Sequence, residues 1–224
     1  MTRRREFIQH AASRATALAA VPVWLGPGIL SPRQDAGATS DEWDLAWTSR
    51  LRGKHKAVFD VAEVESGFGV YRAAAWAGQY MDVLKATPAD LSLVVILRAH
   101  AVVLALQQPF WDKYEVGRAR RVTHPVTLRE TTKNPVLLDE SDGLPAPLAN
   151  AALPKQLGRG VIALACNLAL QSWIDVIKAK RKVSEEEARK EALAALVPGV
   201  ILQPSGVFAA TLAQEHGCAY IRAS

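Results

Sequence analysis

Cys166 is the side chain of this sequence with the most distinctive reactivity. It follows the apolar run Val161–Ala165 and precedes an amphipathic segment that begins at Asn167. A thiol where a strand meets a helix lies at the positive end of the helix dipole, which favours the thiolate. A thiolate accepts sulfur or binds a soft metal, whereas a buried thiol is also a common small hydrophobic residue. Cys166 is therefore a candidate sulfur acceptor, and a packing role is its alternative.

Other polar side chains follow the ends of further apolar runs. In open α/β sheets, ligands bind at the carboxyl ends of the strands, where helix N-termini also point. We expect one pocket at this edge, with Glu63, Glu65 and Gln203 nearby. The candidate ligand-binding residues around it are Asp60, Arg98, His100, Asn167, Ser205 and Gly206.

Several of these residues also have a purely structural interpretation. Arg98 either pairs with Asp60 or holds an anionic ligand. His100 is either a proton donor or metal ligand, or an exposed histidine at the start of a helix. Ser205 has no histidine or acid beside it in sequence, so Pro-Ser-Gly is interpreted as a helix cap rather than as a nucleophile.

Cofactor and metal motifs are absent from the sequence. It contains no GxGxxG, no P-loop and no Cys-x-x-Cys, and the other histidines of the expected domain, at 55, 124 and 216, lack metal-ligand spacing. We therefore expect no cofactor and no metal, and a carrier rather than a turnover enzyme. A metal- or haem-associated factor that uses His100 and Cys166 is a weaker alternative.

Apolar runs alternate with amphipathic segments along most of the chain. This order predicts an α/β three-layer sandwich with a mostly parallel sheet of about five strands. Residues 118–150 lack periodicity and form an irregular excursion that is either functional or an assembly arm. The aromatic segment Phe110–Tyr114 is interpreted as packing, with a subunit interface as the alternative. The expected strands are 56–62, 91–97, 161–165, 200–203 and 219–222.

The first 38 residues have the composition of an export signal. Thr2–Ile8 resembles the Arg-Arg-x-Phe-Leu pattern of twin-arginine signals, and a mildly apolar stretch and Ala36–Ala38 follow. This predicts a signal peptide at 1–38, a lead-in at 39–54 and a domain at 55–224, exported by the twin-arginine translocase to the periplasm. A basic surface helix is the alternative. The apolar stretch is too short and interrupted for a stable membrane span.

Charge and cysteine content narrow the possibilities further. Of the net charge of +5, most lies in the first 38 residues, which hold five arginines and two acidic residues, so nucleic-acid binding is not indicated. Cys166 ends one expected strand and Cys218 begins another. In a parallel sheet these positions lie at opposite edges, beyond the reach of a disulfide, so two free thiols are expected.

Five short motifs resemble the DsrE/DsrF-like family of small sulfur-relay proteins: Lys56–Asp60, Cys166–Asn167, Val197–Val200, Pro204–Val207 and Ala219–Ile221. The resemblance implies a DsrE-like fold, assembly as trimers or hexamers, and a persulfide on Cys166. The chain departs from the family at Leu168–Leu170, where relatives have polar residues, and at Ala99, where exported relatives have histidine. We expect an exported DsrE-like carrier of a small ligand or of sulfur; the alternative is a non-catalytic oligomeric interaction module of the cell envelope.

Overall fold

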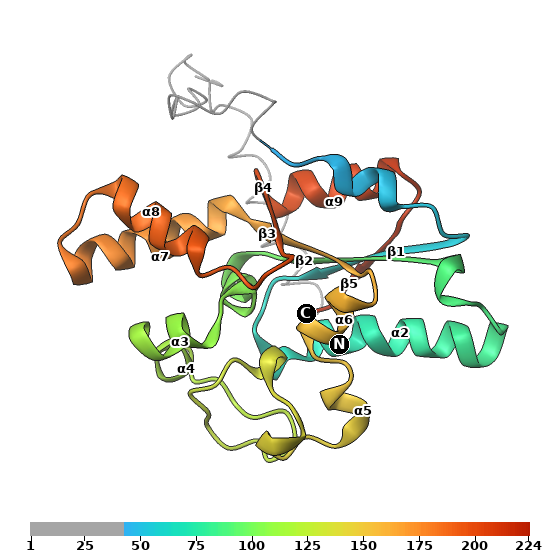
Figure 1. Cartoon of the computed structure of the whole chain (residues 1–224), viewed down its shortest axis with the longest axis horizontal. Coiled ribbons are helices and arrows are strands. Elements are labelled where there is room, and N and C mark those ends of the chain that lie inside the picture. The colour runs from blue at the N-terminus through green and yellow to red at the C-terminus, as the bar shows by residue number, and fades with distance from the viewer. Residues whose placement is uncertain (1–42) are drawn as a thin grey trace, which may run out of the picture. The chain divides into compact units, whose positions relative to one another are not determined.

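The computed structural model describes residues 43–224, and the expected signal peptide lies outside this range. Five parallel strands form one sheet in the order β4-β3-β2-β1-β5 (Figure 1). All five expected strands are present, within a residue or two of their predicted bounds. They are β1 (His55–Val61), β2 (Leu91–Leu97), β3 (Ile162–Cys166), β4 (Ile201–Gln203) and β5 (Ala219–Arg222).

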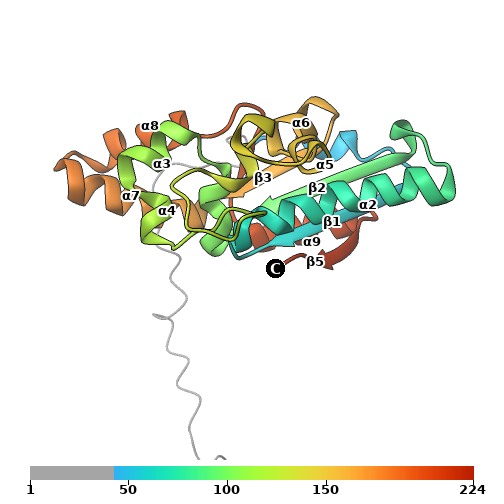
Figure 2. The same cartoon turned by 90° about the horizontal axis from the view of Figure 1, so that it is seen from below.

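The order of the strands decides which helices cover which face. The chain steps in one direction from β1 to β4 and then returns past β1 to place β5. Because crossovers between parallel strands are right-handed, the reversal puts the last helix, α9 (Gly206–Glu215), on the opposite face from α2 (Phe68–Leu84) and α7 (Asn167–Arg181). Figure 1 shows α9 above the sheet and α2 below it, and Figure 2 shows α2 running along the covered face.

Alternate strand residues fill two separate cores. Phe59, Val95 and Leu97 point to the larger core beneath α2 and α7. Val94 and Ile96 point to the smaller core with α9, which also buries Trp47 and Leu51 of the lead-in. β2 is buried on both faces, as expected for a central parallel strand. The three-layer α/β sandwich predicted from the sequence is confirmed.

Shorter elements complete the fold. Residues 99–105 form a 3-10 helix, and residues 101–105 within it are completely buried. The remaining elements are η2 (Ala46–Arg50), η3 (Glu65–Gly67), η4 (Pro88–Asp90), η5 (Ala99–Ala105), α3 (Gln108–Tyr114), α4 (Val116–Ala119), η6 (Pro135–Leu137), η7 (Glu140–Asp142), α5 (Ala146–Ala149), α6 (Leu153–Gly158) and α8 (Glu185–Ala194).

The segment 118–150 contains short helices and turns and is firmly packed. Asn134 is completely buried, and its Nδ2 donates to the carbonyls of Leu104 (3.1 Å) and Leu106 (2.8 Å). The hydroxyl of Tyr71 in α2 donates to the carbonyl of Pro135. Burial raises the pKa of Tyr71 to about 12, so the hydroxyl stays protonated at neutral pH. These bonds hold the excursion against η5 and α2.

Among residues 43–224, no helix is long and apolar enough to cross a bilayer.

Candidate functional site

A buried ion pair lies at the carboxyl edge of the sheet. Asp60 of β1 is 3% exposed and accepts two hydrogen bonds from Arg98, one from Nε at 2.6 Å and one from Nη2 at 2.8 Å. The hydroxyl of Tyr220 in β5 donates to the second carboxylate oxygen. Arg98 follows β2 directly, so three neighbouring strands contribute one side chain each to this network.

The network keeps Asp60 ionised. Burial raises the pKa of Asp60, but hydrogen bonds from Arg98 and Tyr220 and the nearby charges of Arg98 and Arg222 outweigh burial and hold the pKa below its ordinary value. The bond to Asp60 in turn raises the pKa of Arg98 and that of Tyr220. The charge of Arg98 is therefore neutralised by Asp60. Of the two roles that the sequence left open for Arg98, the structure shows the ion pair with Asp60.

Gly206 positions α9 against this pair. A Cβ at Gly206 would lie 2.6 Å from the Cβ and Cδ of Arg98, so only glycine allows the first turn of α9 to rest on the arginine stem. Ser205 caps the same helix, and its Oγ accepts from the backbone N–H of Phe208 at 3.0 Å. Both residues hold α9 in place, and the cap interpretation of Ser205 is confirmed.

A separate open cavity of about 470 Å³ lies beside the network. Its walls come from the loop after β1, the start of η5 and the segment after α4. In this cavity His100 Nδ1 lies 2.9 Å from a carboxylate oxygen of Glu63. The lining residues are Glu63, Val64, Glu65, His100, Ala119, Arg120 and Arg121.

The two arginines of the cavity have no carboxylate partner among the described residues. Glu65 pairs with Arg72, and Glu63 pairs with His100. Across residues 43–224, the Arg121 side chain has no hydrogen-bonding or ionic partner, and Arg120 contacts only the ring of Trp173, at 5.7 Å from its centroid. The cavity therefore presents to a ligand two guanidinium groups that form no ion pair, beside the carboxylates of Glu63 and Glu65.

Strained backbone conformations gather around the same cavity. Four non-glycine residues at or next to its lining have positive φ: Glu65 (34°), Ser66 (55°), Ala99 (47°) and Arg121 (49°). Such conformations cost roughly 1–3 kcal/mol each and cluster at ligand sites and switch regions. Ser66 is held by a hydrogen bond of 2.6 Å between its Oγ and the hydroxyl of Thr123 in the excursion.

Cys166 lies at the same edge but outside this cavity. It is 6% exposed and caps α7, where its Sγ accepts from the backbone N–H of Ala169 at 3.4 Å. Leu97 pairs with Ala165 in the sheet, so Arg98 and Cys166 follow side by side on neighbouring strands. On the other side, Cys166 pairs with Gln203, which is completely buried.

The second cysteine has a different environment. Cys218 is 5% exposed and belongs to the small apolar core under α9, whereas Cys166 belongs to none of the apolar clusters of residues 43–224. Burial raises the pKa of the Cys218 thiol, and the charge of Lys56 only partly offsets this. Both thiols are free, as predicted.

The structure corrects the expectation of one shared pocket. Only His100 of the six candidate ligand-binding residues lines the carboxyl-edge cavity. Asp60 and Arg98 neutralise each other, and Asn167 accepts a hydrogen bond of 3.1 Å from Arg189. The polar residues do gather at one edge, as the parallel sheet requires, but their side chains leave the strands in different directions and take separate partners.

Arg120, Arg121 and Tyr220 were missed from the sequence. The two arginines belong to the dense basic run Arg118–Arg121, which was a usable signal at the start of the excursion. Tyr220 gave no signal, because only strand order places β5 beside β1. Trp111 is completely buried, and its Nε1 donates to the carbonyl of Val103 at 2.8 Å, so its segment packs within the chain.

No cluster of three or more histidine, cysteine or acidic side chains suited to a metal ion occurs in the described part of the chain. Comparison of the chain with family models, with curated proteins and with solved structures gives no match. The resemblance to DsrE/DsrF-like proteins therefore stays a prediction from short motifs.

Proposed function

We propose that this protein is a carrier that binds a small oxyanion in the carboxyl-edge cavity. The observation that carries the proposal is the pair Arg120 and Arg121, which line an open cavity of about 470 Å³ without acidic partners among the described residues. Guanidinium groups donate paired hydrogen bonds that match the oxygens of carboxylates, sulfates and related anions. The carboxyl edge of a parallel sheet is also where such folds bind ligands.

His100 supplies a further polar group for the ligand. Glu63 accepts at Nδ1 of the ring, so Nδ1 carries a proton and Nε2 has no partner within residues 43–224. No thiol or hydroxyl lines the cavity, and Cys166 lies outside it. These features favour binding and release of an anion over covalent turnover.

Isothermal titration with sulfate, thiosulfate and succinate tests this proposal. We expect at least one of these anions to bind, and Arg121→Gln or Arg120→Gln to weaken binding about tenfold or more, since a hydrogen bond to a charged group contributes about 1.5–3 kcal/mol. Arg118→Gln is the matched control, because Arg118 belongs to the same basic run but pairs with Glu115 outside the cavity. Absence of binding, or equal weakening by Arg118→Gln, would contradict the proposal.

A second candidate function is sulfur transfer at Cys166, favoured by the Ala169 N–H that points to its sulfur. The thiolate would attack the outer sulfur of a small persulfide donor. The donor S–S bond breaks, its electron pair leaves with the donor thiolate, and a new S–S bond forms on Cys166. The outer sulfur keeps its proton, so the exchange needs no oxidant.

Mass spectrometry after treatment with glutathione persulfide tests sulfur transfer. We expect one added sulfur atom on the peptide that contains Cys166 and none on the peptide with Cys218, which serves as the internal control. Cys166→Ser should abolish the adduct. Equal labelling of both cysteines, or none, would remove this candidate function, and neither outcome bears on anion binding at Arg121.

On the resemblance and the leader sequence alone, we further propose export to the periplasm by the twin-arginine translocase and assembly as a trimer or hexamer. The interaction-module alternative is weakened, because Trp111 is buried inside one chain rather than offered to a partner. Fractionation of cells that express the full chain tests export, and light scattering of the purified protein tests assembly. A cytoplasmic protein, or a monomer, would contradict the respective part.

A further inference from the structure

A second cavity, of about 340 Å³, lies at the opposite edge of the sheet. It opens between α2, α6 and the starts of β2 and β3, far along the strands from the charged carboxyl edge. Most of its walls are apolar. The lining residues are Ala74, Ala77, Gly78, Met81, Pro88, Leu91, Leu93, Gln156, Arg159 and Val161.

Gly78 keeps this cavity open at a measurable cost. It lies in the interior of α2, where glycine is less favourable than alanine. Its φ is not positive, and a Cβ placed on it would meet no atom within 4 Å. Neither backbone conformation nor crowding therefore requires glycine here, and what the missing side chain provides is space in the cavity.

Gln156 lies at the cavity wall, and its amide is held in one orientation by the protein. The residue is 1% exposed, and its Nε2 donates to the carbonyls of Val70 (3.0 Å) and Ala151 (2.7 Å). Two carbonyl acceptors fix the orientation of the amide, since the oxygen cannot take the place of Nε2. Oε1 is thereby left buried with no hydrogen-bond partner.

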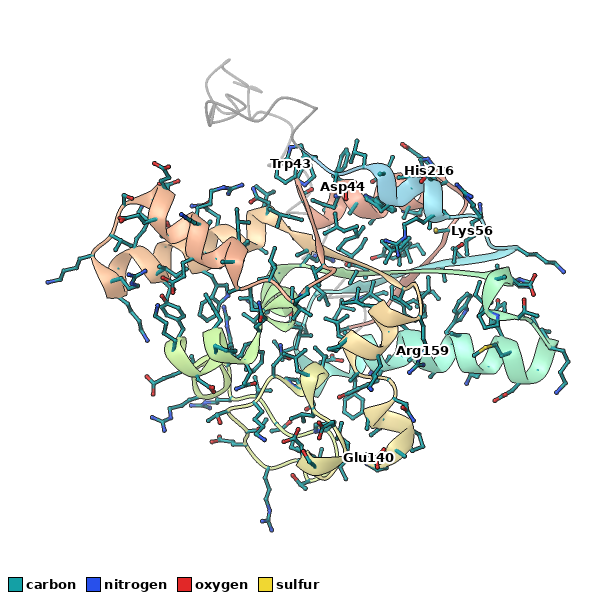
Figure 3. The ribbon with its side chains drawn as sticks, in the orientation of Figure 1. Trp43, Asp44, Lys56, Glu140, Arg159 and His216 are labelled. Atoms are coloured by element: carbon teal, nitrogen blue, oxygen red, sulfur yellow. The ribbon has the colours of Figure 1, made fainter. Side chains whose placement is uncertain are left out.

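Arg159 adds a positive charge at the cavity. It caps the C-terminus of α6, and Figure 3 shows it between α6 and α2. Its Nη2 donates to the carbonyl of Asn150, and no carboxylate among residues 43–224 pairs with it. A guanidinium that is anchored through one nitrogen and otherwise unpaired is suited to a carboxylate or sulfonate.

We propose that this cavity binds a small amphipathic anion, such as a medium-chain carboxylate. The apolar body of the ligand lies against Gly78, Met81 and Leu93, and its charged group lies at Arg159. The volume supports this class of ligand, being about twice the ~150 Å³ of a dry cavity that holds benzene and within the roughly 300–1,000 Å³ of ligand pockets. Met81, at the rim, has the flexible side chain that adapts to apolar ligands of different shape.

Titration calorimetry with octanoate, and with uncharged 1-octanol, tests the proposal. We expect octanoate to bind, and Gly78→Leu, which fills the cavity, to weaken both ligands about tenfold or more, since burying a leucine-sized volume of ligand contributes roughly 1.5–3 kcal/mol. Ala75→Leu adds a similar side chain to an exposed position of α2 outside the cavity and should leave binding within about twofold of wild type.

The charge at Arg159 is tested separately. Arg159→Gln should weaken octanoate about tenfold while leaving 1-octanol unchanged, and Lys155→Gln, an exposed cation of the same helix, is the matched control. Circular dichroism confirms that each variant is folded. Sulfate should not displace octanoate, which separates this site from the carboxyl-edge cavity.

Three results would overturn the proposal. The first is failure of octanoate to bind the wild-type protein. The second is unchanged binding by the Gly78→Leu variant. The third is binding of phosphatidylglycerol vesicles without binding of dispersed octanoate, which would assign Arg159 and the apolar rim to a lipid surface instead.

Discussion

The two edges of the sheet differ in almost every physical property. The carboxyl edge holds the Asp60–Arg98–Tyr220 network, paired charges and a strained backbone around an open polar cavity. The opposite edge, where the strands begin and which we call the amino edge, holds a mainly apolar cavity. Gly78 of α2 lines this cavity, and its φ is not positive. In a parallel sheet the helix N-termini and the carboxyl ends of the strands meet at one edge, so polar and charged side chains gather there. Both edges therefore hold a cavity, and the two cavities differ in the character of their walls, which are charged at the carboxyl edge and mainly apolar at the other.

The largest effect should come from the carboxyl edge. Asp60→Asn should lower the free energy of unfolding at pH 7 by about 3 kcal/mol, because it leaves the partly exposed Arg98 without its buried counter-ion. The native pKa of Asp60 is depressed, so its contribution is present above the ordinary carboxyl pKa of about 4 and is lost as the pH falls through the native value. Urea unfolding at pH 7 and pH 3.5 should therefore show a smaller difference between variant and wild type at the lower pH.

Tyr220→Phe should have an intermediate effect at the same edge. It removes one hydrogen bond to the Asp60 carboxylate, and Tyr220 is 45% exposed, so we expect a loss of about 1–1.5 kcal/mol in urea unfolding. The variant should also lose stability at a higher pH on acidification than wild type, because the pKa of Asp60 rises towards its ordinary value. An unchanged acid transition would show that Arg98 alone holds the carboxylate.

At the amino edge, a substitution should raise the stability of the protein instead of lowering it. Gly78→Ala should raise the free energy of unfolding by roughly 0.5–1 kcal/mol, because it improves helix propensity and its Cβ meets no neighbouring atom. Ala75→Gly in the same helix should lower stability by a similar amount. Thermal melts of both variants check this pair, and a loss of stability in Gly78→Ala would break the contrast between the edges.

The smallest expected effect is a difference between the rates at which the two thiols are chemically labelled. Iodoacetamide at pH 8 should modify Cys166 faster than Cys218, because Cys218 lies in an apolar core and burial raises its pKa. Peptide mapping over time gives the two rates, and Cys166→Ser and Cys218→Ser proteins identify each signal. Faster labelling of Cys218 than of Cys166 would contradict this prediction and show that the thiol before β5 is the more accessible one.

The fold could be predicted from the sequence because the strands are uniform apolar runs that alternate with amphipathic segments. The bounds of β2 and β5 match the expected residues. The site was predicted only as far as the edge where it lies. Whether Arg98 turns to Asp60 or to a ligand depends on strand order and on the close approach of Gly206, and neither has a local signal.

The two cavities could not be predicted from the sequence either, because they depend on how segments distant along the chain pack together. Arg121 belongs to a segment that is joined to the loop after β1 by contacts between residues far apart in sequence, such as the hydrogen bond between Ser66 and Thr123. The amino-edge cavity depends on how far apart α2 and α6 pack, which no periodicity encodes. Gly78 was a usable hint, since a glycine within an amphipathic helix is unfavourable without a reason.

The unequal lengths of the strands have a consequence for self-association. The outer strands β4 and β5 have three and four residues, whereas the inner strands β1 and β2 have seven each. Short outer strands expose few unpaired amide and carbonyl groups with which a strand of another molecule could pair. Ribbon-like polymerisation through backbone pairing is thereby disfavoured, and contacts between molecules of this protein would have to be made by side chains of its helices and loops.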